Sequence, residues 1–513
     1  MASAADTPDG GGQARLLASG SLVQQLAQVT GLLALFAIVT VLARRLTLEE
    51  FGVYGLLSSL AGYLLVIQNS AASAAVRNMA AATDDPGRTQ AFSTATVIYA
   101  AAGAITGLLI VIVGFVLASA IDLSDDLESK ARLGALLLGL VTAFGWPITI
   151  YRDALRASQL FVRAALIDMG ALVVFAALVL ALAFGGAGLA VLIGASGTIP
   201  MFSGIGAAVA ARRRRLPFRF QAGTITRESA ADFARLAGYV SLAETAGAII
   251  YALDRIILGL FTNAATVGLY EGPIRAHNVI RALNGALSVT VLPSASRYFG
   301  EDDQARLHEL VTRGIRYTLA LVVPLTVTGM VLAPPLLEVW LGPEFREGGT
   351  AMAILMSYWL VNGCTGVVQG VIVAGGSAPA LARLAWVVAL SNLAISLVLT
   401  PLFGLEGVAI AMAVPYFAVF PFLMRVLLRL VPVPAGALLR EAFLPAYAVG
   451  LGLAAVLAGA RAAFELDTLA AALVAVVAGP VLAWIAYYAA VLRPDERLLV
   501  RQVAAGLRPS RRG

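Results

Sequence analysis

Four polar side chains lie close together within the hydrophobic stretch 266–292. They are one acid, two cations and one amide, namely Glu271, Arg275, Asn278 and Arg281. In a helix that turns about 100° per residue, all four fall within an arc of about 120°. Guanidinium groups match phosphate oxygens with fixed, forked donors, so this face predicts a surface that binds a diphosphate in a central cavity.

A simpler interpretation also accounts for part of this face. Glu271 and Arg275 are four residues apart, a spacing at which opposite charges on a helix pair and stabilise it. A charge at the centre of a bilayer costs about 2.5–3.5 kcal/mol, so it needs either a partner or an aqueous cavity. Both interpretations meet that need and stay open. His277 lies at the edge of the arc and is a candidate proton relay.

Three further charged residues occur in the hydrophobic stretch 236–261. Glu244 and Arg255 are eleven residues apart and share a helix face, and Asp254 precedes Arg255. Asp254 and Arg255 are candidates either for a structural pair or for substrate contact, and Asp254 is also a candidate for ion coupling. Glu244, together with Asp168 in the stretch 161–184, has no obvious local partner. Either acid is a candidate for protonation coupled to ion movement, or for pairing with an arginine on another helix.

Uncharged amides and a basic cluster complete the candidate site residues. Five amides, Gln24, Gln25 and Gln28 in the first hydrophobic stretch and Gln68 and Asn69 in the second, are candidates for hydrogen bonds to sugar hydroxyls or to neighbouring helices. Three arginines gather at the predicted cytoplasmic end of the fourth and fifth stretches, namely Arg152, Arg156 and Arg163. They are interpreted as topology anchors or as the first contact for an incoming anionic headgroup.

The elements that must position these residues are membrane helices. The chain has 513 residues, of which 60% are apolar and 13% charged, whereas soluble domains hold about 25% charged residues. Backbone groups in hydrocarbon must be satisfied within their own segment, which predicts an all-α polytopic membrane protein. Fourteen hydrophobic segments are expected to span the bilayer, at 21–43, 51–75, 91–120, 133–151, 161–184, 187–210, 236–261, 266–292, 315–338, 351–374, 382–401, 404–424, 441–460 and 467–492.

The basic residues predict the orientation of these spans. With the N-terminus inside, the inner segments carry 27 of the 36 Lys and Arg residues and the outer loops carry 6. Since basic residues beside spans stay preferentially on the cytoplasmic side, both termini are predicted to be cytoplasmic.

The middle of the chain contains an internal repeat. Gly52-Val53-Tyr54 returns as Gly268-Leu269-Tyr270, and Phe184-Gly185 returns at nearly the same offset as Phe403-Gly404. Duplicated helical halves are typical of secondary transporters. The predicted organisation is an N-terminal tail, an N-lobe of spans 1–6, a basic cytosolic linker, a C-lobe of spans 7–12, an appended pair of spans and a C-terminal tail, at 1–19, 20–211, 212–235, 236–430, 431–492 and 493–513.

Several classes of chemistry are excluded or disfavoured. One cysteine and two histidines are too few for a Cys/His metal site, and no cofactor is expected. The only lysine, Lys130, follows no glycine-rich phosphate loop, so hydrolysis of ATP through a Walker-type site is not expected. The run Arg212–Arg215 is interpreted as an anchor to anionic lipid headgroups rather than as a nucleic-acid site.

Two junctions resemble a known family. The segment from Leu42 to Gly55 (LARRLTLEEFGVYG) is similar to the junction "ArxLgxxxfGxY" of the Wzx-type polysaccharide and oligosaccharide flippases, which belong to the superfamily of MATE exporters and lipid II flippases. The segment from Leu253 to Phe261 (LDRIILGLF), followed by Val267-Gly268-Leu269-Tyr270, resembles that family's pattern "DrxxlgxfxxxxxvGxY". The resemblance covers roughly residues 15–430.

The resemblance implies a fold and a function. The expected fold is two six-helix lobes in a V shape plus a C-terminal helix pair. The expected function is alternating-access translocation of an undecaprenyl-diphosphate-linked oligosaccharide across a bacterial cytoplasmic membrane, for surface polysaccharide synthesis. Expected partners are the lipid-linked oligosaccharide, membrane lipids and polysaccharide polymerase or assembly proteins. The alternatives are a MATE-like ion-coupled exporter, disfavoured by the arginines near 275–281, and a membrane glycosyltransferase or polymerase.

Overall fold

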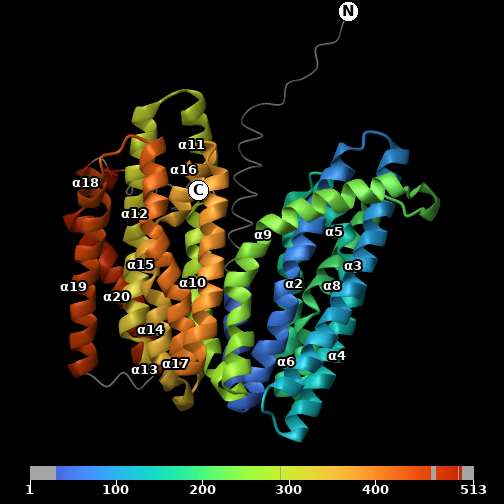
Figure 1. The fold of residues 1–513 in the computed structure, drawn as a ribbon, viewed down its shortest axis with the longest axis horizontal. Helices are drawn as coiled ribbons and strands as arrows, with labels where there is room; N and C mark the ends of the chain where they lie inside the picture. The colour runs from blue at the N-terminus through green and yellow to red at the C-terminus, as the bar shows by residue number, and fades with distance from the viewer. Residues whose placement is uncertain (1–29, 289–290, 464–468, 495, 499–513) are drawn as a thin grey trace, which may run out of the picture. The chain divides into compact units, whose positions relative to one another are not determined.

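The structure is a computed structural model that describes residues 30–288, 291–463, 469–494 and 496–498. Within those residues every regular element is a helix (Figure 1), as the hydrophobic segments predict. The helices divide into two compact units, and the division falls between Gly268 and Leu269. The predicted linker at 212–235 separates the two repeats of the sequence, which need not coincide with the two compact units. This linker stays a prediction.

The first unit contains the helices that precede this division. Its first described helix covers residues 30–45. The helices that follow are α2 (Leu48–Ala81), α3 (Asp85–Ala120), α4 (Asp125–Ile148), α5 (Ile150–Ala157), α6 (Phe161–Phe184), α7 (Leu189–Ser196), α8 (Ile199–Arg213), the short η1 (Ala222–Thr224) and α9 (Arg227–Phe261).

The second unit begins inside helix α10 (Ala264–Ser288), after its first turn. Its other helices are α11 (Val291–Gly300), α12 (Gln304–Val331), α13 (Ala333–Leu341), η2 (Pro343–Gly348), α14 (Gly349–Ser357), α15 (Trp359–Asn362), α16 (Thr365–Ala374), α17 (Ala378–Leu430), α18 (Ala435–Leu438), η3 (Leu439–Phe443), α19 (Leu444–Ala463) and α20 (Leu469–Ala490).

Polar residues just outside the hydrophobic segments determine where several helices begin. Thr47 precedes α2 and accepts a hydrogen bond from the Glu50 backbone N–H, while the Glu50 side chain accepts one from the Thr47 N–H. Asp84 caps α3 through the Gly87 N–H, and Ser124 caps α4 through the Leu127 N–H. Each cap satisfies a backbone donor that has no partner inside its helix.

A break inside α17 separates two of the predicted spans. Gly404 has φ 53° and ψ −122°, a conformation outside the helical region that strongly favours glycine. A methyl group on Gly407 would lie 2.3 Å from the carbonyl oxygen of Leu399, so the two halves of α17 approach closely at this break. The sequence places the boundary between the segments 382–401 and 404–424 at the same point.

The chain is a multi-pass membrane protein. In the part of the chain that the structure describes, seven helical stretches are long and apolar enough to cross a bilayer, or up to nine if two bent pairs each count as one. All fourteen predicted segments overlap helix in their described residues. The number of fourteen spans stays a prediction. Helix α10 is not among these seven to nine stretches. It carries three charged residues, Glu271, Arg275 and Arg281.

Small residues let helices α3 and α4 approach at backbone distance. A methyl group on Gly107 would lie 2.4 Å from the carbonyl oxygen of Gly139, and one on Gly139 would lie 2.6 Å from that of Gly107. Glycine is therefore required on both sides of this crossing. Helices pack this way in lipid, where small residues at the interface permit close van der Waals contact.

The appended helices α19 and α20 pack against α12 within the second unit. The indole N–H of Trp484 donates to the carbonyl oxygen of Ala320 at 3.1 Å. Beyond the end of α20, the buried carboxylate of Glu496 pairs with the buried guanidinium of Arg316 and accepts a hydrogen bond of 2.7 Å from Tyr317. The C-terminal helix pair is thus fixed to the same helix at two levels.

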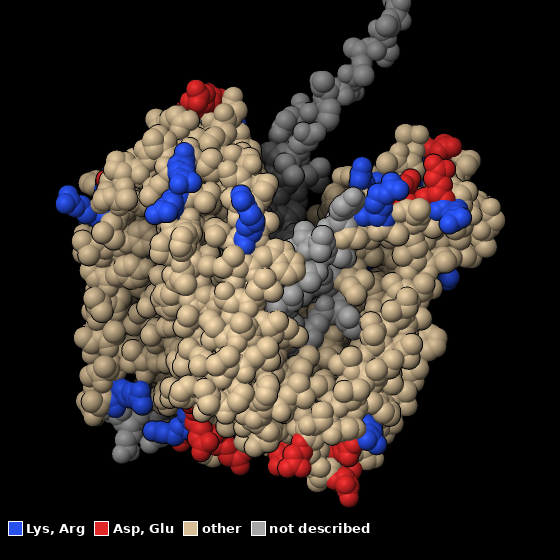
Figure 2. Space-filling view, viewed as in Figure 1, with Lys and Arg blue, Asp and Glu red and all other residues tan. Residues whose placement is uncertain are grey.

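Charged side chains lie mainly toward the helix ends. Figure 2 shows Lys, Arg, Asp and Glu gathered near both ends of each unit's helices, with other residues between them. Large apolar side chains such as Phe144 and Leu451 are 71% and 73% exposed, as expected for surfaces that face lipid. At one helix end, Lys130 pairs with Asp126 at 2.6 Å and with Glu50 at 3.6 Å.

Candidate functional site

The acid and the first arginine of the polar face on α10 form an ion pair. Nε and Nη2 of Arg275 both donate to Oε2 of Glu271, at 3.1 and 3.0 Å. The Glu271 side chain is 1% exposed and that of Arg275 is 27% exposed. The i,i+4 pairing expected from the sequence is confirmed. Whether this face also contacts a substrate stays a prediction.

The rest of α10 has two chemically different sides. Asn278 is half-buried and Arg281 is exposed. His277 is fully buried and forms a hydrogen bond with the hydroxyl of Tyr358. The ring of Tyr358 stacks on that of Tyr416 in α17, with centroids 4.6 Å apart. One side of α10 is therefore held by an aromatic cluster, while another presents an amide and a guanidinium.

Two adjacent charged residues of α9, Asp254 and Arg255, are buried. Asp254 is 1% exposed and Arg255 is 8% exposed, so both lie inside the first unit. The side chain of Glu244 lies outside the described part of the chain, as do Gln24, Gln25 and Gln28. Their proposed contacts stay predictions.

Asn69 and its neighbour Gln68 have different environments. Asn69 is exposed, whereas Gln68 is 6% exposed and donates to the hydroxyl of Thr149 at 3.5 Å. Thr149 stands at the break between α4 and α5. Gln68 therefore bonds a neighbouring helix, the structural alternative drawn from the sequence for this group of amides.

The basic cluster near α5 belongs to a buried network. Asp153 is fully buried, accepts a hydrogen bond of 2.8 Å from Tyr99 and pairs with Arg152 at 3.4 Å and with Arg156 at 3.6 Å. Arg156 also pairs with Asp168 of α6 at 3.0 Å. Two aspartates thus engage the two arginines within the first unit, and both predicted roles of Arg152 and Arg156, topology anchor and headgroup contact, stay predictions.

Asp168 of α6 pairs with an arginine of another helix, Arg156 of α5. Besides Arg156, its carboxylate accepts a hydrogen bond from the hydroxyl of Ser203 in α8. The alternative, pairing with an arginine on another helix, is confirmed. Arg163 is half-buried, and its role in receiving a headgroup stays a prediction.

Sequence reasoning missed three polar groups that complete these clusters. Tyr99, Ser203 and Tyr358 each supply a hydroxyl to a residue that the sequence did single out. A tyrosine or serine inside a hydrophobic segment is too common to mark a partner. The only available signal is that a buried charge requires nearby donors or acceptors.

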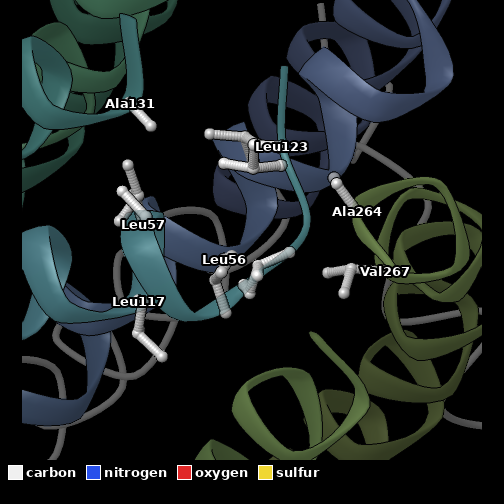
Figure 3. A pocket seen from close by; sticks show the side chains of 11 residues that line it. Leu56, Leu57, Leu117, Leu123, Ala131, Ala264 and Val267 are labelled. Carbon is white, nitrogen blue, oxygen red and sulfur yellow. The ribbon is translucent and has the colours of Figure 1, made fainter. Parts of the chain in front are cut away.

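One small pocket lies inside the first unit, between α2, α3, α4 and the first turn of α10 (Figure 3). Its volume is about 10 Å³, and its walls are formed by apolar residues that include Leu56, Leu117, Ala264 and Val267. A space of this size holds about one water molecule and offers it no polar partner. The pocket therefore cannot receive a sugar or a phosphate. Among the described residues, no group of three or more His, Cys, Asp and Glu side chains could hold a metal ion.

The fold defines the chain as a helical membrane protein of the architecture shared by lipid II flippases and MATE transporters. The inward closed structure of the lipid II flippase MurJ has a TM-score of 0.69 at 14% identity, covering 92% of this chain and 99% of that one. An inward-facing multidrug-resistance MATE transporter has a TM-score of 0.59 at 14% identity, covering 81% and 100%. At such low identity, these similarities establish the fold alone.

Sequence comparison gives the family. Residues 41–348 match the polysaccharide biosynthesis protein family model, and the chain belongs to that family. Residues 283–479 also match the model of the lipid II flippase MurJ. The resemblance drawn from the two glycine-tyrosine junctions is confirmed.

Curated relatives match over shorter segments. The probable low-salt glycan biosynthesis flippase Agl15 of Haloferax volcanii is 24% identical over 178 residues, 34% of this chain and 38% of Agl15. The probable flippase AglR of the same organism is 28% identical over 162 residues, 31% of this chain and 34% of AglR. The matches span about a third of the length of these relatives.

Proposed function

We propose that this protein is a flippase for a lipid-linked oligosaccharide. In this proposal the substrate is carried on undecaprenyl diphosphate and moves from the inner to the outer leaflet of a bacterial cytoplasmic membrane. Fourteen spans, with both termini in the cytoplasm, form two duplicated lobes that expose the substrate alternately to each side. No covalent bond of the substrate changes, so the protein acts as a transporter rather than as an enzyme.

The observation that carries this proposal is the charge on α10. Glu271 and Arg275 form an ion pair, and Arg281 is a second arginine on the same helix. Arg281 is exposed and Asn278 is half-buried, so both have accessible surface. An anionic diphosphate that crosses hydrocarbon needs a cation with forked donors, and this helix supplies one.

Membership of the polysaccharide biosynthesis protein family supports the class of substrate. Two relatives named as probable flippases, one of them in glycan biosynthesis, support translocation as the activity. The fold shared with a lipid II flippase is consistent with a large amphipathic substrate.

The direct test is transport of a fluorescent undecaprenyl-diphosphate-linked oligosaccharide in proteoliposomes. Arg281→Gln is expected to slow transport by about ten-fold or more, because a hydrogen bond to a charged group contributes about 1.5–3 kcal/mol. Arg383→Gln is the matched control, since Arg383 is an exposed arginine whose Nε donates to a backbone carbonyl oxygen in α17. Wild-type transport rates in Arg281→Gln would remove this residue from the mechanism.

The role of the ion pair between Glu271 and Arg275 is tested with a different variant. Replacing Arg275 alone leaves a buried carboxylate without its ion pair and endangers folding. The double variant Glu271→Gln and Arg275→Gln keeps a polar side chain at both positions and removes both charges. If Arg275 contacts the diphosphate, this variant folds and transports slowly, whereas a purely structural pair leaves transport unchanged.

The same vesicles discriminate the alternatives. A membrane glycosyltransferase or polymerase changes the mass of the labelled lipid, and a flippase does not. A MATE-like exporter moves a small cationic dye across the vesicle membrane and leaves the lipid-linked sugar in its original leaflet. Either outcome would overturn the proposed function.

A further inference from the structure

The repeated glycine-tyrosine motifs meet each other in space. A methyl group placed on Gly52 of α2 would lie 1.8 Å from the carbonyl oxygen of Ala264 and 2.8 Å from the backbone nitrogen of Gly268. A methyl group on Gly268 would lie 2.3 Å from the carbonyl oxygen of Leu48. No side chain other than hydrogen fits at either position, so the first turns of α2 and α10 touch backbone to backbone.

This contact has the symmetry of the internal repeat. Gly52 corresponds to Gly268, and Leu48 corresponds to Ala264 at the same offset along the chain. The approach of Gly52 to Ala264 and the approach of Gly268 to Leu48 are therefore one contact made twice. A reciprocal contact of this kind is the signature of a two-fold axis. The local two-fold axis of this contact passes between the two glycines.

The helix starts on either side of the contact are built alike. Thr47 caps α2 through the backbone N–H of Glu50 at 3.2 Å, and Asn263 caps α10 through that of Thr266 at 2.9 Å. The two capping residues are separated by the same offset as the two glycines. Ala264 and Val267 of α10 line the small apolar pocket together with Leu56 of α2 (Figure 3), so the first turn of α10 is embedded in the first unit.

The two compact units divide directly beyond this contact. Gly268 is the last residue of the first unit and Leu269 is the first residue of the second, although both lie in the continuous helix α10. Pro273, one turn further on, has no N–H to donate to the carbonyl oxygen of Leu269. Helix α10 therefore lacks an internal hydrogen bond at the junction of the units, where a helix bends most easily.

We propose that Gly52 and Gly268 are positioning residues for the transport proposed above, and this role rests on that function. Their contact holds the first turn of α10 on α2 as a fixed pivot. The remainder of α10, which carries Arg275 and Arg281, tilts with the second unit by bending between Leu269 and Pro273. A pivot on the symmetry axis without interlocking side chains lets one repeat turn against the other while the contact persists.

The first arm of the test replaces each glycine by alanine. Gly52→Ala and Gly268→Ala are expected to slow proteoliposome transport by about ten-fold, the effect of overpacking a tight contact, while binding of the lipid-linked sugar stays unchanged. Gly62→Ala on α2 and Gly285→Ala on α10 are matched controls, because a methyl group at either position meets no atom within 4 Å. Since both glycines serve one contact, the double variant is expected to be no slower than the slower single variant. Wild-type rates in both single variants, or fully additive losses, would overturn the proposal.

The second arm leaves the glycines intact, so it applies even if the alanine variants do not fold. Spin labels are attached to cysteines at Glu49 and Ala265, across the pivot, and in a second protein at Glu49 and Glu309, across the two units. The native Cys364 is fully buried and is not expected to take up label. Electron–electron distance measurements are made with and without the lipid-linked sugar.

The expected result is one narrow, unchanging distance between labels at Glu49 and Ala265, and two populations or a shift between labels at Glu49 and Glu309. A changing first distance means that the contact slides, and a fixed second distance means that the units do not turn about it. Either result would contradict the pivot. If the unmodified protein moves no lipid-linked sugar, the proposed function fails, but the distances still decide whether the pivot exists.

Discussion

The hydroxyl of Tyr99 in α3 donates a hydrogen bond of 2.8 Å to the carboxylate of Asp153 in α5, and both side chains are fully buried. Asp153 is also paired with Arg152 and Arg156, so the hydroxyl satisfies a carboxylate that is already engaged by two cations. This relationship connects a long helix to the short helix that follows the break at Thr149. It makes the cluster a structural element of the first unit.

Removing the Tyr99 hydroxyl tests this connection. Tyr99→Phe is expected to lower the free energy of unfolding by about 1.5–3 kcal/mol, because hydrogen bonds to charged groups contribute that much. Thermal unfolding in detergent gives the measurement. Tyr151→Phe is the control, since its ring packs against Phe92 at 5.5 Å and, among the described residues, its hydroxyl has no hydrogen bond. Equal losses in both variants would contradict the assigned role.

The buried pair of Arg316 and Glu496 is expected to dominate the attachment of the C-terminal segment. Glu496→Ala leaves the Arg316 guanidinium buried without its carboxylate and is expected to cost about 3–5 kcal/mol in stability. Glu441→Ala is the matched control, because Glu441 pairs with Arg493 at 3.0 Å where both side chains are about half exposed. Such exposed pairs contribute about 0–1 kcal/mol. Coinciding melting curves for the two variants would refute the expected difference in stability.

The crossing of α3 and α4 predicts a strong sensitivity to small substitutions. Gly107→Ala or Gly139→Ala places a methyl group against the opposite carbonyl oxygen and is expected to destabilise the protein by about 1–3 kcal/mol. Gly170→Ala in α6 has open space around the added methyl group and serves as the control. The yield of monodisperse protein and its unfolding temperature are the readouts. Full stability of both α3 and α4 variants would mean that the helices separate at no cost.

Asp168 provides a test between structural pairing and ion coupling. Because Arg156 and Ser203 both bind its carboxylate, Asp168→Asn is expected to lower the unfolding temperature and to leave the dependence of transport on ion gradients unchanged. Transport is measured in proteoliposomes with imposed proton or sodium gradients. A variant of normal stability that no longer responds to the gradient would restore the coupling role.

Much of the architecture follows from local sequence patterns. Hydrophobic length and the polar residues at its edges predict the helices, because a helix in lipid satisfies its own backbone. The break at Gly404 is also predictable from the sequence, because Pro401 and Gly404 interrupt one apolar run. The pairing of Glu271 with Arg275 is predictable because i,i+4 geometry is fixed within a helix.

The contacts between distant segments could not be predicted in the same way. Arg316 and Glu496 lie far apart in the sequence, and nothing in either neighbourhood indicates the other. The repeat identifies Gly52 and Gly268 as equivalent, yet equivalence under duplication does not require contact. To predict the partner of Asp168, one must know that the packing of α5 and α6 brings Arg156 to it. Each of these depends on tertiary packing rather than on periodicity.

The ion pairs of Lys130 give the chain a built-in reporter. As the sole lysine, it marks the one peptide bond that a lysine-specific protease can cut, which would yield fragments 1–130 and 131–513. That bond lies in the second turn of α4, where Asp126 and Glu50 hold the ammonium group. Helical backbone must unwind locally before a protease can bind it. The rate of this single cleavage therefore measures how often the start of α4 opens in the otherwise native protein.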